Sequence, residues 1–310
     1  MNIRIHAIFE FMLRTRFAPS PTGLLHIGNA YSALKCQQWA EKNHAALLLR
    51  IEDIDHTRCR PEYRQAIPED LQWLGIHWHG EVTRQSERIE KYRQALEQLK
   101  DMGIVYPCFC TRRSIQMEIA SIGIAPHLDE YADTYPGTCR SIDPPRSKQR
   151  IINENHSWRI NVGKAFRLLS NPIAWRDGSG RSHPVTAASI GDIIIGRKDI
   201  AFSYHLAVVV DDAEQEITHV IRGEDLIHVT PLHRLLQALL GLPDPVYIHH
   251  PLLADSQGRR LTKRNRAIPL KQLIKLGIHP ESLRHYLLTT IPPVCPWNEE
   301  NTDLILKHLC

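Results

Sequence analysis

The chain has 310 residues, of which 43% are hydrophobic, so it is long enough to bury a core of ordinary size. No run of about 18 apolar residues occurs, which argues against a membrane-spanning helix. The net charge of +4 is mildly basic, which suits a polyanionic partner without requiring one. The apolar N-terminal stretch contains His6 and Glu10 and no cleavage site follows it, so we expect a cytoplasmic protein with residues 1–12 as an extension.

Residues 13–105 alternate between strand-like and helix-like patterns. The β-prone run TRFA ends at Pro19, and ALLLRIED is a continuous apolar run typical of a buried parallel strand. Strands are expected at 15–18 and 45–52, and helices at 27–43, 61–74 and 86–102. This alternation predicts an α/β fold with a parallel sheet and right-handed crossovers.

The pattern changes over residues 106–199. Pro, Gly, Ser and Asp become frequent, and helices are harder to recognise. The runs WRINV at 158–162 and GDIIIG at 191–196 are typical of antiparallel strands. We interpret this stretch as an insertion with its own small structure.

Residues 200–255 return to the first pattern. A helix is well marked, with Thr230 as its N-cap, Pro231 at its first position and Gly241 just past its end. The run PVYIHHPLLAD predicts a further strand. Residues 256–310 then comprise a basic loop, SQGRRLTKRNRA, and helical segments.

The strongest motif is RFAPSPTGLLHIGN at 16–29. A strand leads into a Pro/Gly turn, and His26 lies beside a helix N-terminus, where backbone N–H groups and the helix dipole favour a phosphate. His26 can donate to an α-phosphate as charge develops there, and Asn29 offers a second neutral donor. The alternative, a turn with an incidental histidine, does not explain the whole string.

A second motif, RRLTKRN at 259–265, follows a predicted strand. Lys263 lies between arginines and can neutralise the β- and γ-phosphates of ATP from a loop that acts mainly in the transition state. Alone, such a segment is usually a solvated basic loop. Its value comes from its pairing with the first motif.

In this order the two motifs resemble the HIGH and KMSKS signatures of class I aminoacyl-tRNA synthetases. RFAPSPTG, LLRIEDID, VIRGED and LTKRN together resemble the catalytic half of the glutamyl group of that family. Asn29 replaces the second His of HIGH, and LTKRN lacks the Met and final Ser of KMSKS. The resemblance implies a Rossmann-type domain in two halves (13–105 and 200–255), an inserted zinc-bearing subdomain and a short helical C-terminal part, with ATP and Mg²⁺ as substrate.

The resemblance also implies a glutamate site, and the residue types agree with it. Arginine forks bind carboxylates, a carboxylate at a strand end holds an ammonium group, and hydroxyls and backbone atoms bind the remaining polar atoms. The predicted glutamate-binding residues are Arg16, Phe17, Ala18, Pro19, Ser20, Glu52, Tyr204 and Arg222, and those for ATP are His26, Asn29 and Lys263. His26 and Lys263 are the predicted catalytic residues. Each residue in isolation also fits an ordinary structural role.

Three cysteines predict a structural zinc site. Cys108 and Cys110 have C-x-C spacing, and Cys139 adds a third thiolate, so a fourth ligand is needed. Resemblance to the glutamyl group favours Tyr135, and His127 and Tyr131 remain alternatives. Unligated buried cysteines are the competing interpretation.

Residues 266–310 are too few for an anticodon-binding domain, so we expect a free-standing catalytic half. Such chains resemble enzymes that activate L-glutamate with ATP without tRNA and transfer it to queuosine at the wobble position of tRNA(Asp). A monomer with these partners is the expectation. The alternatives are a synthetase that charges a tRNA 3′ end, a silent tRNA-binding paralogue, and a ligase with a non-RNA acceptor.

Overall fold

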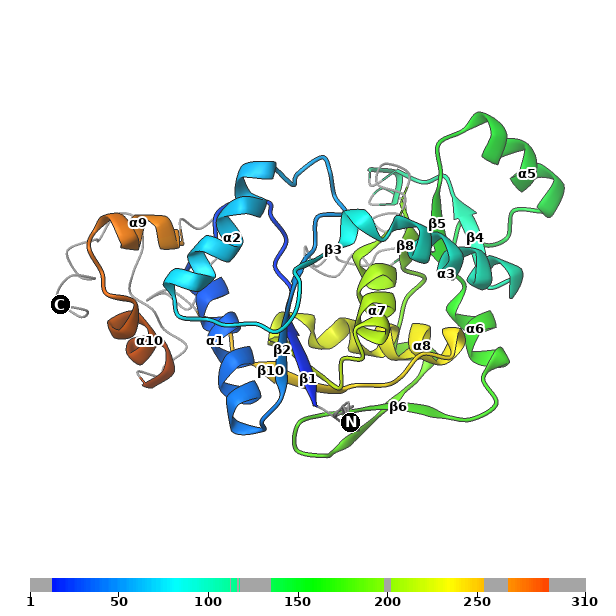
Figure 1. Ribbon diagram of the computed structural model, residues 1–310. Helices are drawn as coiled ribbons and strands as arrows, with labels where there is room; N and C mark the ends of the chain where they lie inside the picture. Colours follow the sequence, from blue (N-terminus) through cyan, green and yellow to red (C-terminus); the bar gives the residue numbers. More distant parts are fainter. Residues whose placement is uncertain are drawn as a thin grey trace, which may run out of the picture.

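The computed structural model describes residues 13–111, 113–115, 117, 135–197, 202–253 and 267–289. The molecule is elongated, with α9 and α10 at one end and α5 at the other (Figure 1). Within the described residues, no helix combines the length and the apolar character that crossing a lipid bilayer requires.

A parallel sheet forms the middle of the molecule. One part has the strand order β1-β2-β3, and β1 and β2 are joined through α1. The other part pairs β9 with β10. The two parts adjoin where the Thr218 N–H donates to the Arg14 carbonyl at 3.0 Å. The elements are β1 (Arg14–Phe17), α1 (Ile27–Lys42), β2 (Ala46–Ile51), α2 (Pro61–Trp73), β3 (Thr83–Arg84), β9 (His219–Gly223), α8 (Thr230–Leu240) and β10 (Val246–His250).

Antiparallel strands lie between the two parts in the sequence. The strands β4 (Val105–Cys108), β5 (Ser157–Ile160) and β8 (Ile194–Gly196) form one sheet, and β6 (Ile173–Arg176) pairs with β7 (Ser182–Val185). The remaining helices are α3 (Ile89–Asp101), α5 (Pro144–Asn153), α6 (Val162–Leu168), α7 (Tyr204–Glu214), α9 (Leu270–Lys275) and α10 (Pro280–Thr289), with short 3-10 turns at Gln85–Glu87, Ala187–Ser189 and Glu224–Val229.

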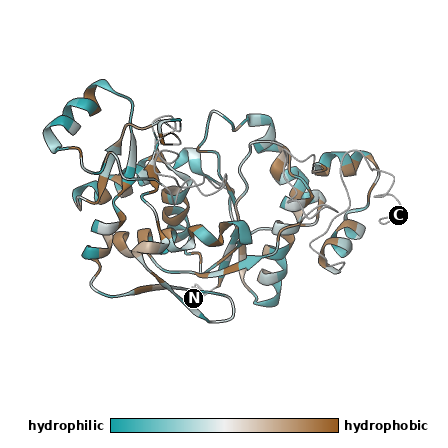
Figure 2. Ribbon diagram, turned by 180° about the vertical axis from the view of Figure 1, so that it is seen from behind, coloured by the Kyte–Doolittle hydropathy of each residue, from teal (hydrophilic) through white to brown (hydrophobic). Residues whose placement is uncertain are grey.

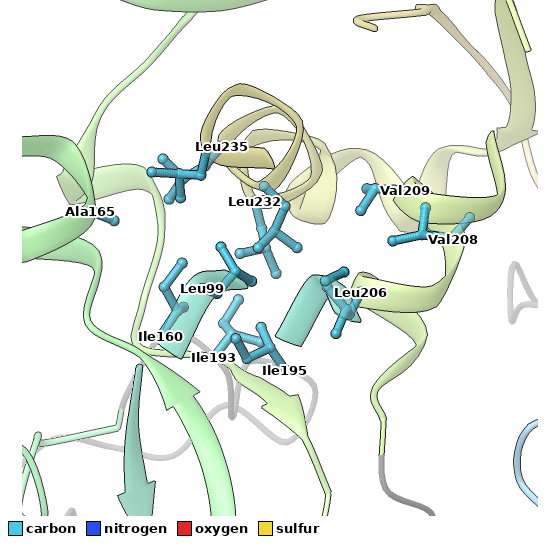
Figure 3. Close-up of a cluster of buried hydrophobic side chains, with 14 of the residues drawn as sticks. Leu99, Ile160, Ala165, Ile193, Ile195, Leu206, Val208, Val209, Leu232 and Leu235 are labelled. Carbon is cyan, nitrogen blue, oxygen red and sulfur yellow. The ribbon is translucent and has the colours of Figure 1, made fainter. Parts of the chain in front are cut away.

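Two large hydrophobic clusters hold these elements together. One joins α1, β1, β2 and α2 to α9 and α10. The other joins α3, α7 and α8 to the antiparallel sheet, and Leu99, Leu206 and Leu232 converge in it (Figure 3). Hydrophobic residues gather on these central elements, whereas α5, which buries no residue, is mainly hydrophilic (Figure 2). Segments that are far apart in the sequence, such as α1 and α10, are therefore held together by shared hydrophobic packing.

The predicted strands at 15–18 and 45–52, the first three helices and the antiparallel pair from WRINV and GDIIIG are confirmed. The prediction of Thr230 as an N-cap is wrong, because a 3-10 turn at Glu224–Val229 runs directly into α8. Thr230 is already helical, and its hydroxyl lies 3.3 Å from the Leu226 carbonyl. Gly241 ends the helix in the left-handed conformation, as expected.

Candidate active site

A cavity of about 930 Å³ opens at the carboxyl ends of β1, β2 and β9. Crevices at this edge of an open parallel sheet are where ligands bind in such folds. Ten of the eleven residues predicted to bind glutamate or ATP line this one cavity: Arg16, Phe17, Ala18, Pro19, Ser20, His26, Asn29, Glu52, Tyr204 and Arg222. A second cavity, of about 680 Å³ beside α3 and β5, contains none of them.

His26 caps the N-terminus of α1. Its Nδ1 accepts the Gly28 N–H at 3.1 Å, and the Asn29 Oδ1 accepts the His26 N–H at 3.1 Å. The neutral His26 ring therefore carries its proton on Nε2 and can donate from that atom. Asn29 has its oxygen engaged, which leaves its amide N–H groups as donors. Both side chains thus present donors to the cavity at a helix N-terminus, a geometry suited to a phosphate.

Lys263 lies outside the described residues. The residues described after it begin at 267, and their backbone is hydrogen-bonded to the first motif. The Ile27 N–H donates to the Ile268 carbonyl at 3.2 Å, and the Leu270 N–H donates to the Leu25 carbonyl at 2.8 Å. The segment that follows the basic loop is therefore fixed beside His26.

Arg16 belongs to a buried ion network that the sequence interpretation missed. Arg16 Nε and Nη2 donate to the two oxygens of Asp212 at 2.9 and 3.3 Å, and Arg50 Nη1 lies 2.8 Å from Asp212 Oδ1. Burial acts to raise the pKa of Asp212, but Arg16 and Arg50 outweigh it and hold the pKa below its ordinary value. The available signals were an arginine inside the apolar run ALLLRI and two acids that end the apolar run AVVVDD. Arg16 is thus oriented by a carboxylate that already balances its charge.

Glu52 lies directly after β2, at the cavity wall, and is 7% exposed. Its Oε1 accepts from Arg50 Nη2 at 3.3 Å. Burial raises the pKa of Glu52 to about 7, against the opposing effect of Arg50 and Arg16. Because Arg50 is also shared with Asp212 and lies 3.8 Å from Asp211, Glu52 receives only part of one positive charge. Glu52 is therefore suited to attract a cation in the cavity.

Arg222, like Arg16, is buried, at 5% exposure. Unlike Arg16, it makes no ion pair with any carboxylate of the described residues. Its hydrogen bonds go to neutral groups, namely the imidazoles of His233 and His249, the Thr230 hydroxyl and the Leu226 carbonyl. The Tyr247 ring also lies 5.0 Å from its guanidinium carbon. A buried cation at a cavity wall with no carboxylate partner among the described residues is suited to bind an anion.

Tyr204 is the first residue of α7, whose N-cap Ser203 accepts the Leu206 N–H. Burial raises its pKa, so the phenol is neutral and can donate its O–H. Tyr204 lines the same cavity as Arg222. Its ring contacts the His205 and His233 rings, at centroid distances of 5.5 and 5.7 Å.

The three predicted cysteine ligands lie together at the start of the antiparallel region. The sulfurs of Cys108, Cys110 and Cys139 all lie within 4.8 Å of one another and can hold a metal ion. The Tyr135 hydroxyl lies 3.4 Å from Cys108 Sγ and 3.7 Å from Cys110 Sγ. A tetrahedral zinc with bonds of ~2.3 Å to sulfur and ~2.0 Å to oxygen separates such ligands by roughly 3.5 Å. The donor set and spacing therefore fit zinc, and the alternatives His127 and Tyr131 lie outside the described residues.

Residues 12–294 match the family model described as tRNA synthetases class I (E and Q), catalytic domain. The chain belongs to this family. The α/β class predicted from the sequence is that of this synthetase catalytic domain, and the prediction of a ligase is confirmed with it.

Several relatives of this class I synthetase are similar over most of its length. Glutamyl-Q tRNA(Asp) synthetase from Rhodobacter capsulatus is 41% identical over 274 residues, which cover 88% of this chain and 99% of the relative. The enzyme of the same name from Symbiobacterium thermophilum is 40% identical, with 89% and 85% covered. A solved structure, a glutamate tRNA ligase from Elizabethkingia meningosepticum in complex with its amino acid, superposes with a TM-score of 0.73 at 26% identity. That match covers 90% of this synthetase but only 61% of the ligase.

Proposed function

We propose that this chain activates L-glutamate with ATP in the absence of tRNA and transfers the glutamate to queuosine at the wobble position of tRNA(Asp). The observation that carries the amino-acid assignment is the unbalanced charge of Arg222 in the same cavity as Glu52. A cation without a carboxylate partner selects a carboxylate, and the acid selects an ammonium group. Because the α-carboxylate of the substrate must react with ATP, the carboxylate that Arg222 selects is a second one on the side chain, and glutamate carries such a group together with its ammonium group. The acceptor is proposed from the names of relatives that the chain matches over 99% and 85% of their lengths.

In the first step, an oxygen of the glutamate α-carboxylate attacks the α-phosphorus of Mg·ATP. The bond from that phosphorus to the bridging oxygen of pyrophosphate breaks, so glutamyl-adenylate forms and pyrophosphate leaves. His26 Nε2 donates to the α-phosphate oxygen as its charge grows, and the N-terminus of α1 lies beside it. Lys263 is assigned to the β- and γ-phosphates from its place in the KMSKS-like motif.

In the proposed site, Arg222 holds the side-chain carboxylate of glutamate, Glu52 its ammonium group, and Tyr204 donates its hydroxyl to a carboxylate oxygen. Phe17, Ala18, Pro19 and Ser20 form the adjoining wall. Arg16 contributes positive potential, although Asp212 occupies most of its fork. In the second step, a hydroxyl of the queuosine cyclopentene ring attacks the glutamyl carbonyl carbon, its proton passes to the leaving phosphate of AMP, an ester forms, and AMP leaves with the mixed-anhydride oxygen.

The test is ATP–pyrophosphate exchange with glutamate and no tRNA, with aspartate and glutamine as controls. We expect exchange with glutamate only, followed by transfer of labelled glutamate to tRNA(Asp) that carries queuosine but not to tRNA(Asp) that lacks it. Exchange that requires tRNA, with the ester on the terminal adenosine, would instead identify an enzyme that charges tRNA 3′ ends. Binding of tRNA with no exchange at all would identify a silent paralogue.

We further propose that Cys108, Cys110, Cys139 and Tyr135 bind a structural Zn²⁺. The expected result is one zinc per chain by elemental analysis. Cys110→Ser is expected to lose most of it, and Cys59→Ser, a change at a thiol outside the cluster, is the matched control and should retain it. Tyr135→Phe is expected to weaken zinc retention against a chelator, since three thiolates remain. Unchanged retention would contradict Tyr135 as the fourth ligand and point to His127 or Tyr131.

A further inference from the structure

Arg222 is held in place entirely by neutral acceptors. Nε donates to His249 Nε2 at 3.3 Å, and Nη1 donates to His233 Nδ1 at 3.0 Å. Nη2 donates to the Thr230 hydroxyl at 2.8 Å and to the Leu226 carbonyl at 3.2 Å. Four of the five guanidinium N–H groups are thereby fixed, and the fifth, on Nη1, has no partner within the described residues.

The two histidines that accept from Arg222 are uncharged. Burial, and then the charge of Arg222, lower the pKa of His249 to about 4 and hold that of His233 well below its ordinary value. Burial likewise lowers the pKa of His205, behind His233, to about 4. The rings can therefore orient the guanidinium without cancelling or adding to its charge.

The hydrogen bonds also fix the tautomers of two of these rings. Because His233 Nδ1 accepts from Arg222, its proton lies on Nε2, which is 3.1 Å from His205 Nδ1. His233 must then donate to His205, whose own proton lies on Nε2. In this row of hydrogen bonds His233 therefore donates to His205 and accepts from Arg222. His233 cannot point its N–H toward Arg222 without breaking both of these hydrogen bonds.

We propose that His233 and His249 are positioning residues for glutamate selection: they fix the Arg222 guanidinium while leaving its charge for the side-chain carboxylate of the substrate. This inference rests on the proposed function of the cavity. A carboxylate in place of either imidazole would orient Arg222 equally well, as Asp212 orients Arg16. It would also balance the charge in advance, so the substrate would have to compete with an internal anion.

The test compares His233→Asn with His233→Asp. The Asn Oδ1 can occupy the position of Nδ1 as a neutral acceptor, and Asp has the same shape with a negative charge that Arg222 keeps ionised. The readouts are KM for glutamate, KM for ATP and kcat in the exchange assay, together with the melting temperature. We expect the KM for glutamate to be at least about tenfold higher in the Asp variant than in the Asn variant, with similar KM for ATP. The preference for glutamate over glutamine should fall in the Asp variant.

A role limited to packing predicts equal KM values for glutamate in the two variants, and that result would overturn the proposal. If His233→Asp does not fold, His249→Gln and His249→Glu provide the same comparison at the second acceptor, because the Gln Oε1 can occupy the position of Nε2. The wild-type assay distinguishes a failure of the proposed function from a failure of the proposed role of the histidines. Without glutamate-dependent exchange in the wild type, the proposed function itself fails; with exchange but no difference between the paired variants, only the role of the histidines fails.

Discussion

Two arginines at the same cavity show how one residue type can have opposite electrostatic states. Arg16 and Arg222 are 4% and 5% exposed and lie on the neighbouring strands β1 and β9. Arg16 is balanced by Asp212, whereas Arg222 is surrounded by imidazoles, a hydroxyl and a carbonyl. Burial alone therefore does not show whether a buried arginine has a charge that is already balanced. The charge of the groups around it does.

The largest expected effect on stability is at the balanced arginine. Asp212→Asn removes the carboxylate shared by Arg16 and Arg50 and leaves two buried guanidiniums undercompensated. Breaking such a buried pair costs ~3–5 kcal/mol, so we expect the free energy of unfolding, measured by urea denaturation, to fall by about that amount. Glu154→Gln, at an ion pair on the surface of α5, is the control and should leave the urea midpoint nearly unchanged. A small loss in Asp212→Asn would contradict the view that Asp212 balances the charge of Arg16.

A change at Arg222 should lower catalytic activity more than folding stability. Arg222→Met removes a charge that no described carboxylate balances, so the loss of stability should be smaller than in Asp212→Asn. Glutamate activation should fall by about a hundredfold in kcat/KM, since leaving the buried substrate carboxylate unpaired costs ~3 kcal/mol and 1.4 kcal/mol corresponds to about tenfold. Both quantities can be measured on one preparation, by urea denaturation and pyrophosphate exchange. A larger loss of folding stability than of activity would contradict a binding role.

The smallest expected effect is a pH dependence from Glu52, which lines the same cavity as both arginines. Its pKa is raised by burial to about 7, and only its ionised form attracts the glutamate ammonium group. For one group with this pKa, kcat/KM for glutamate should be about tenfold higher at pH 8 than at pH 6. Glu52→Gln should be less active at both values and show little pH dependence. A flat wild-type profile would show that Glu52 does not titrate in this range.

The same pKa shift has a consequence for stability with a defined sign. Between its ordinary pKa of 4.5 and about 7, Glu52 is protonated when folded and ionised when unfolded. The folded state then binds more protons, so stability decreases as pH rises through this window. Glu52→Gln should remove that part of the slope. Activity and stability should therefore change in opposite directions with pH at this one residue.

The sequence predicted the cavity wall well because its motifs are local. The turn RFAPSPTG places residues 16–20 at the end of β1 and His26 at the start of α1. Neighbouring residues in such a turn remain neighbours in space. The continuous apolar run before Glu52 likewise predicted a strand whose end places that acid at the sheet edge. The cysteine cluster was predicted from spacing alone, and Tyr135 lies where a fourth ligand is needed. Its role, like those of the other site residues, stays a prediction.

The sequence by itself determined the fold class, the first strands and helices of the α/β pattern, and ten of the residues that line the cavity. It did not determine which of its arginines carries an unbalanced charge. That depends on Asp212 meeting Arg16 across 196 residues and on His233 meeting Arg222 from the next helix. Periodicity specifies which face of an element is buried, whereas the charge state of a buried group depends on which atoms the tertiary packing places within a few ångströms of it.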